Sequence, residues 1–285
     1  MVFALFALLS ACGPKTAAPA VPAAAPVAVD ALDALKAEAA SLWDQRGDKA
    51  QLQAALAKYA SIYATDPTNR DAVYHLTRGW YFLGDGHETE KEAKLSTWAT
   101  AIEYGNKCLA MNKEFSDLLA KGDETEASAA RAFTKDDLPC LYWTSSALGK
   151  WAKLTGIGVT LKHLPTVKAY MTRVGELDNS YYYNGPERYW GAYYAAIPSF
   201  AGQDLNKSKE FFDKSLAANP NFFGTHVLLA GEWAVKKQDK ATFEKELNWV
   251  IAGDANSIPE VKPEMEAAQR MAKDLLAQEG DLFAN

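Results

Sequence analysis

Apolar residues recur every three or four positions along most of the chain, which is the spacing of an α-helix. Leu32, Leu35, Ala39 and Leu42 follow this pattern, and residues 52–63 repeat it. No long segment alternates apolar and polar residues or is rich in the β-branched residues that strands prefer. Glycines, prolines and aspartates divide the chain into helical segments of about 12–20 residues. We therefore predict an all-α fold whose helices are joined by short turns.

Several of these segments carry the pattern of the second helix of a tetratricopeptide repeat. In that pattern a small residue is followed by an aromatic residue, a second small residue and a proline. Two stretches fit its spacing, with Ile62 replacing one small residue: Ser208, Phe212, Ser215 and Pro220, and Ala55, Tyr59, Ile62 and Pro67. Two weaker copies are Val167, Met171, Val174 and Asn179, and Ala101, Gly105, Cys108 and Lys113. Their spacing is uneven, so we predict a helical-hairpin solenoid with about four degenerate repeats and insertions.

Two further segments lie outside these copies. Residues 115–135 are rich in Asp, Glu and Ala, and we expect them to form an extra solvated helix. Residues 264–278 have a helical pattern near the C-terminus. Because the last repeat of a solenoid needs an element that covers its open end, we expect this helix to cap the stack.

The first residues of the chain have the features of a lipoprotein signal. The apolar run 1–9 is too short to span a bilayer at 1.5 Å per residue, and Leu9-Ser10-Ala11-Cys12 resembles the bacterial lipobox. Residues 13–29 contain four prolines and no apolar periodicity, as in an extended spacer. We predict a signal peptide at residues 1–11, a lipidated Cys12 with a spacer to residue 29, and an all-α domain over residues 30–285. An ordinary cleaved signal and a plain N-terminal apolar stub are the alternatives.

Composition excludes several classes of function. The chain of 285 residues has 30 Lys and Arg against 36 Asp and Glu, a net charge of −6. A nucleic-acid-binding protein needs a basic surface, so this balance argues against that class. The four histidines are scattered, no metal-ligating spacing occurs, and no GxSxG, P-loop or GxGxxG motif is present. We expect no cofactor, no metal and no catalytic residues.

Two small groups of reactive side chains carry alternative interpretations. Asp85, His87 and Glu88 lie close together and could hold a metal, but we expect them to cap the next helix. Cys108 and Cys140 are 32 residues apart on separate predicted helices. We expect them to be buried free thiols, and a disulfide in an oxidising periplasm is the alternative.

Three segments are richer in aromatic residues than a helical solenoid requires: residues 79–87, 138–154 and 180–198. Seven of the nineteen residues in the third segment are Tyr or Trp. Gly185-Pro186 is typical of a helix start. On that helix Tyr189, Tyr193 and Ile197 share one face, and Gly191 and Ala192 leave room for a neighbouring helix or a ligand. Tyr and Trp combine a wide apolar ring with a polar tip, which suits a cavity lining or an interface. Packing in the core is the alternative for each ring.

The same segments resemble a known family. The stretches GDGH, LPCLYWTSSALGKWAKL and YYYNGPERYWGAYYAAIP are similar to those of the T-component lipoproteins of TRAP (tripartite ATP-independent periplasmic) transporters, the TatT family. The resemblance extends from about residue 31 to Phe283. Cys140 stands where Ala is expected in the family's LPxLYW motif, a departure that concerns packing.

This resemblance implies a periplasmic, tetratricopeptide-like lipoprotein, a homotrimer, that docks the solute-binding protein of the transporter. It also implies an internal pore or cleft for a hydrophobic or amphipathic small molecule. From the aromatic clustering we expect the ligand or partner site to contain Trp143, Trp151, Tyr182, Tyr183, Arg188, Tyr189, Tyr193 and Tyr194. We expect Arg188 to pair with an acidic residue rather than to bind an anionic ligand.

Two other functions remain open from the sequence. A tetratricopeptide scaffold lipoprotein for outer-membrane assembly or pilus biogenesis would share the fold, and only the aromatic motifs separate it from the transporter component. A hydrolase would need a catalytic constellation, and the sequence offers none. The sequence does not distinguish an anchor in the inner membrane from one in the outer membrane.

Overall fold

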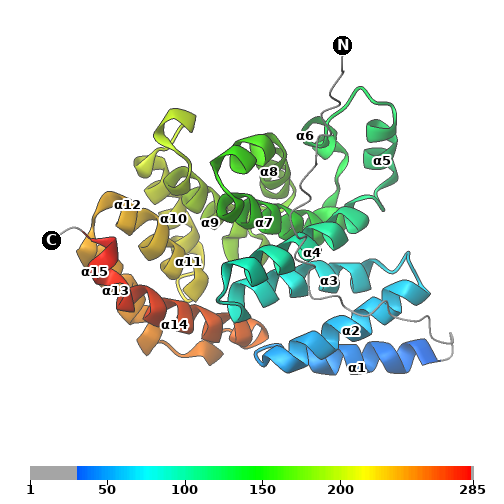
Figure 1. Ribbon diagram of the computed structural model, residues 1–285, viewed down its shortest axis with the longest axis horizontal. Helices are drawn as coiled ribbons and strands as arrows, with labels where there is room; N and C mark the ends of the chain where they lie inside the picture. Colours follow the sequence, from blue (N-terminus) through cyan, green and yellow to red (C-terminus); the bar gives the residue numbers. More distant parts are fainter. Residues whose placement is uncertain (1–30, 284–285) are drawn as a thin grey trace, which may run out of the picture.

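The computed structural model describes residues 31–283, and every regular element in that range is helical (Figure 1). The all-α prediction is confirmed for these residues. The predicted signal peptide, the predicted lipidation at Cys12 and the predicted spacer lie outside the described residues. The α-helices are α1 (Leu32–Asp44), α2 (Lys49–Thr65), α3 (Arg70–Phe82), α4 (Lys91–Leu109), α5 (Lys113–Ala120), α6 (Glu126–Ala129), α7 (Leu138–Thr155), α8 (Ile157–Asp178), α9 (Tyr181–Ala196), α10 (Leu205–Ala218), α11 (Phe223–Leu228), α12 (Val235–Lys237), α13 (Lys240–Ala252), α14 (Lys262–Ala277) and α15 (Glu279–Leu282).

The helices that carry the small–aromatic–small pattern each pack against the helix before them. These pairs are α1 with α2, α3 with α4, α7 with α8, and α9 with α10, and they lie side by side across the molecule (Figure 1). The pattern residues Ala55 and Phe212 are fully buried in these contacts. Helices α13 and α14 pack together as well and carry no such pattern.

The contact between α9 and α10 shows why the pattern needs small residues. A side chain at Gly191 would place its Cβ 2.8 Å from the Phe212 ring, closer than carbon atoms approach. The buried Ser208 hydroxyl donates a hydrogen bond of 2.7 Å to the Gly191 carbonyl across the same contact. The space beside Gly191 is therefore taken by a neighbouring helix rather than by a ligand.

The insertion over residues 115–135 differs from the single solvated helix that the sequence predicts. It forms the end of α5, the short α6 and two 3-10 turns, Ala130–Ala132 and Lys135–Asp137. Phe115 and Phe133 are buried, and their ring centroids lie 4.4 Å apart. These two phenylalanines pack in the core and hold the segment against it. Their packing is not apparent from the sequence, because the segment is rich in Asp, Glu and Ala.

The C-terminal helix at residues 264–278 is confirmed as α14, and its position brings the two ends of the domain together. Helix α14 packs on α13, begins beside the turn between α1 and α2, and runs from there toward α15 (Figure 1). At its start Arg46 donates two hydrogen bonds to Glu264, of 3.0 and 2.8 Å, and Arg78 of α3 donates another of 2.8 Å. Arg270 of α14 donates to the Gly86 carbonyl. The row of hairpins is therefore closed on itself by these contacts.

Cys108 of α4 and Cys140 of α7 form a disulfide, so the expectation of free thiols is wrong. Both residues are almost fully buried, and their Cα atoms are 6.1 Å apart. The sequence separation of 32 residues conceals this proximity, because α4 packs directly on α7. Gly105, one turn before Cys108, allows that approach, since a Cβ there would clash with Thr144.

Within residues 31–283, no helix combines the length and the apolar character that a membrane crossing needs.

Candidate functional site

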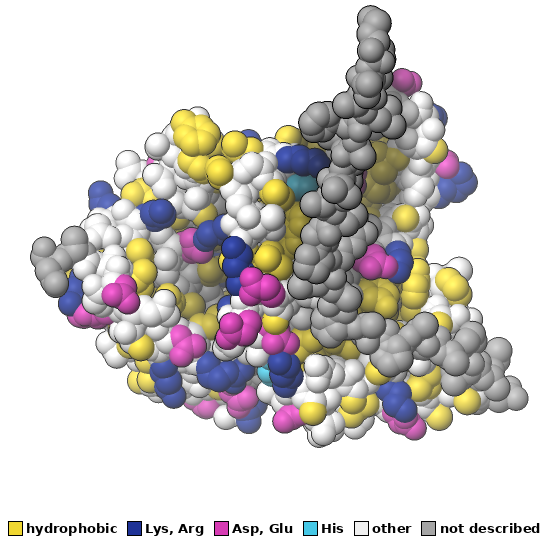
Figure 2. Space-filling model, viewed as in Figure 1, with side chains coloured by type: hydrophobic (Ala, Val, Ile, Leu, Met, Phe, Trp, Pro, Cys, Tyr) yellow, Lys and Arg dark blue, Asp and Glu magenta, His cyan; other side chains and the backbone are white. Residues whose placement is uncertain are grey.

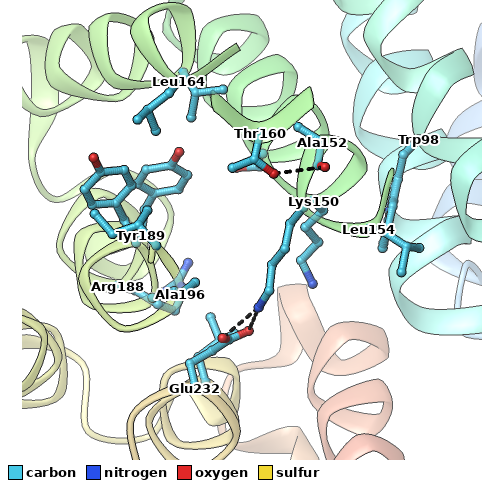
Figure 3. A pocket seen from close by; sticks show the side chains of 18 of the residues that line it. Trp98, Lys150, Ala152, Leu154, Thr160, Leu164, Arg188, Tyr189, Ala196 and Glu232 are labelled. Carbon is cyan, nitrogen blue, oxygen red and sulfur yellow. Dashed lines mark hydrogen bonds and ion pairs between the residues drawn. The ribbon is translucent and has the colours of Figure 1, made fainter. Parts of the chain in front are cut away.

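A cavity of about 580 Å³ lies where α7, α8 and α9 meet α3, α4 and the α11 region. Such a volume is within the range of small-molecule sites, about 300–1,000 Å³. Its walls are mainly apolar, with Leu164 of α8 on one side, Tyr189 of α9 and Trp98 of α4 on others, and Glu232 at the opposite edge from Leu164 (Figure 3). Ile157, half exposed, lies at its edge. An apolar ligand of moderate size would fit this space.

A second cavity of about 120 Å³ adjoins the first. The two share lining residues Tyr81, Tyr142, Lys150, Arg188 and Leu228. The second is bounded on its far side by α14, through Glu264 and Met271 among others. Because α14 closes the row of hairpins, this cavity lies inside the closed arrangement, and the shared residues form the partition between the two spaces.

The backbone beside the partition has an unusual conformation. Tyr182, Tyr183 and Asn184 have φ values of 46°, 58° and 53°, in the left-handed region. Left-handed backbone costs an L-residue roughly 1–2 kcal/mol, so three in a row persist only where the surroundings hold them. The left-handed residues precede Gly185-Pro186, and the right-handed part of α9 begins there, as the sequence predicts.

Arg188 holds this left-handed turn. It is only 5% exposed, and its Nη atoms donate to the carbonyls of Tyr182 and Tyr183, at 3.1 and 3.0 Å, and to the Tyr142 hydroxyl, at 3.0 Å. Its guanidinium lies 4.5 Å from the centre of the Phe222 ring. No acidic residue between positions 31 and 283 forms an ion pair with it, so the expectation of an acidic partner is wrong.

Burial sets the protonation of three tyrosines that line the cavities. It raises the pKa of Tyr81, Tyr182 and Tyr189 above the ordinary tyrosine value. These phenols are neutral at physiological pH, and they supply aromatic surface and neutral hydrogen-bonding groups. The Trp143 and Tyr182 rings pack at 4.7 Å, and the Tyr81 and Trp143 rings at 5.1 Å.

Two π-helical segments place acidic residues at the cavity. Leu83–His87 follows α3 and supplies Asp85, which pairs with Lys150 of α7. Leu229–Ala234 follows α11 and supplies Glu232, which pairs with Lys153 of α7 at 2.6 Å (Figure 3). π-Helical turns often occur at functional sites. Through these two ion pairs, α7 is joined to the segment after α3 at the smaller cavity and to the segment after α11 at the larger one.

Asp85, His87 and Glu88 do not have the roles expected from the sequence, which were to cap the next helix or to hold a metal. Glu88 pairs with Lys49, and His87 contacts the Arg46 carbonyl at 2.9 Å. No side-chain cap is present at the start of α4, so the capping expectation is wrong. Among residues 31–283 no group of His, Cys, Asp and Glu is arranged to hold a metal.

The structure separates the residues expected at the site into two groups. Those that line a cavity are Trp143, Tyr182, Arg188, Tyr189 and Tyr193. Three line neither cavity: Trp151 packs near His163, Tyr183 stacks on Phe222, and Tyr194 stacks on Phe211.

Other lining residues were not expected from the sequence. Tyr81 of α3, Trp98 of α4, Lys150 of α7 and Glu232 of the segment after α11 line the cavities. Tyr81 and Lys150 lie in the aromatic-rich segments 79–87 and 138–154. This richness is the sequence feature that could have indicated their place at the cavities. Trp98 and Glu232 lie in segments of ordinary composition, where only the fold reveals their position.

A family model described as TRAP transporter T-component matches residues 21–283, nearly the whole chain. No curated protein matches the chain.

Proposed function

The chain belongs to the TRAP transporter T-component family, and from this membership we propose that it docks the periplasmic solute-binding protein of a TRAP system and accepts a hydrophobic or amphipathic small molecule. Membership itself gives the protein an accessory role in transport. The ligand would occupy the larger cavity and pass toward the smaller one. The protein would act without catalysis.

The observation that carries this proposal is the pair of adjoining cavities. One opens between α7, α8 and α9, the other lies against α14, and only a shared wall of side chains separates them. A route through the molecule would need that wall to move. A transport accessory has a use for such a route, whereas a scaffold that binds partners on its surface has none.

The ligand half of the proposal is tested at Tyr193. This residue lines the larger cavity, whereas Tyr194 beside it does not. Tyr193→Ala should lower the amount of apolar ligand that co-purifies with the protein, and Tyr194→Ala serves as the matched control. If both folded variants retain ligand equally, the cavity aromatics are only core residues.

Docking and assembly need a separate test. Exposed apolar side chains near the larger cavity are candidates for contact with a partner. One of them, Ile157, lines the cavity, and two others, Leu161 and Phe200, lie close to lining residues in the chain. Figure 2 shows hydrophobic side chains grouped where α9 and α10 meet their connecting loop. Sedimentation velocity of the protein mixed with the solute-binding protein should show a complex, which Phe200→Glu should weaken. Sedimentation equilibrium of the protein alone tests the expected homotrimer.

We also propose that Cys12 carries the lipid that holds the protein in the periplasm, against the cell envelope. Acyl chains add about 0.8 kcal/mol of membrane affinity per buried CH₂, so two or three chains would anchor it firmly. Cys12→Ala should lose metabolic labelling with tritiated palmitate and should be released from membranes. Labelling that persists in this variant would rule out the anchor.

A further inference from the structure

We propose that the ligand of the larger cavity is an amphipathic anion, with a carboxylate head at Arg188 and an apolar tail among the side chains of α8 and α9. This inference rests on the proposed function, because it names the chemistry of the ligand in that cavity. It begins from the charges that line the two spaces.

Each of the other cations that line the cavities has a carboxylate partner within the described chain. Lys150 pairs with Asp85, Lys153 with Glu232, and Arg78 with Glu264. Arg188 lines both cavities, and in residues 31–283 no carboxylate contacts it. Its four hydrogen bonds go to neutral oxygens of Tyr142, Tyr182, Tyr183 and Thr225.

A buried charge without a counterion is costly. Buried charges in proteins are normally paired, since an isolated ion loses its hydration when it is buried. The Phe222 ring compensates only in part, because a cation–π contact is weaker than the hydration that the guanidinium loses. The Nε of Arg188 makes no hydrogen bond to any described residue. This atom is not fully enclosed by the protein. A donor and an uncompensated positive charge are therefore available to a ligand at the partition.

The rest of the cavity determines what the anion carries. Away from Arg188 the wall is mainly apolar and includes Ile157, Leu164, Val167, Ile197 and Pro198. Thr160 also lines it, and its hydroxyl donates to backbone carbonyls of the protein. Leu164 lies on the opposite side of Tyr189 from Arg188 (Figure 3). A head group at Arg188 would thus place an alkyl or ring tail along this apolar wall.

The surface does not supply this selectivity. The chain has a net charge of −6, and on the face shown in Figure 2 basic and acidic side chains are interspersed. A preference for an anion would therefore come from the local charge at Arg188.

The test compares three probes with a ten-carbon chain and different heads: decanoate, decanol and decyltrimethylammonium. Each is titrated by calorimetry, below its micelle concentration, into the full chain carrying Cys12→Ala, so that no detergent is needed. Charge-assisted hydrogen bonds to a buried cation should make decanoate bind at least about tenfold more tightly than decanol. The cationic probe should bind more weakly than either.

Variants assign the preference to Arg188. Arg188→Met should bring the affinities for decanoate and decanol close to each other, and Lys162→Met, an exposed charge on α8, should leave their ratio unchanged. Because Arg188 also holds the left-handed turn, Arg188→Lys is the second variant: it keeps the charge and should keep most of the preference. Equal binding of decanoate and decanol by the unmodified cavity would overturn the anion assignment and leave the proposed ligand site standing. If no probe binds, the ligand half of the proposed function fails with it.

Discussion

At the scale of the residue, Arg188 has a large structural role, because its hydrogen bonds to the Tyr182 and Tyr183 carbonyls hold the left-handed turn at the start of α9. The aromatic richness of residues 180–198 points to a special site, and the structure places a strained turn there. The turn could not be predicted, since Tyr182 and Tyr183 have no local preference for left-handed backbone. It is held by Arg188 and by distant residues, including Asn219, whose side chain donates to Asn184 at 2.6 Å.

A glycine on the same helix gives a residue-scale prediction about packing. Gly191→Ala should destabilise the protein by about 1–3 kcal/mol, because the added methyl would overlap the Phe212 ring and the tight contact of α9 with α10 leaves no room for it. The free energy of unfolding in urea measures this loss. Gly158→Ala is the matched control: nothing lies within 4 Å of its Cβ position, so it should be neutral or raise stability by about 0.5–1 kcal/mol. Equal effects at both glycines would contradict the packing argument.

At the scale of the element, apolar periodicity predicts long helices well and short irregular ones poorly. The second helices α2 and α10 are anticipated because a buried small–aromatic–small stripe has a fixed spacing. The π-helical segments after α3 and α11 are not anticipated, because one extra residue in a turn leaves no clear trace in the pattern. The acidic residues of these segments, Asp85 and Glu232, form ion pairs with lysines of α7 beside the cavities.

The disulfide between α4 and α7 gives a prediction at this scale. Closing a loop of 32 residues should stabilise the fold by about 3–4 kcal/mol relative to the reduced chain. Substitution of both Cys108 and Cys140 by Ala should lower the free energy of unfolding by about this amount. A thiol assay on the unfolded, unreduced Cys12→Ala protein should detect no free thiol, and two thiols per chain would show that the bond does not form.

At the scale of the whole molecule, α14 converts an open row of hairpins into a closed arrangement. The sequence predicts the helix and its place at the end of the stack. It does not predict that Glu264 reaches Arg46 and Arg78, since this contact joins residues about 200 positions apart in the chain. The wall of the smaller cavity depends on that closure.

Removal of the Glu264 carboxylate should therefore lower the free energy of unfolding. Glu264→Gln leaves the buried Arg46 and the largely buried Arg78 without their carboxylate, and the loss of one partner of a buried ion pair costs about 3–5 kcal/mol. Glu266→Gln on the same helix is the control, because its ion pair with Lys262 is exposed and should contribute less than about 1 kcal/mol. Urea denaturation of both variants compares them, and similar stabilities would show that the closure contributes little.

The same carboxylate predicts a dependence of stability on pH. Burial alone would raise the pKa of Glu264, but Arg78 and Arg46 lower it below the usual 4.5. A carboxyl group whose pKa is lower in the folded state stabilises the fold above the unfolded-state pKa and loses that contribution as the pH falls through the folded value. The free energy of unfolding should thus decline below pH 4.5 more steeply in the unmodified protein than in Glu264→Gln. Parallel curves would contradict this assignment.

We propose that this TRAP transporter T-component docks a solute-binding protein and holds a ligand in its cavity. Affinity capture of the membrane-anchored protein from its native envelope, followed by mass spectrometry of the proteins and extracted small molecules, tests both parts together. We expect recovery of a periplasmic solute-binding protein of a TRAP system together with an amphipathic acid. Recovery of outer-membrane-assembly or pilus components, without a solute-binding protein, would contradict it.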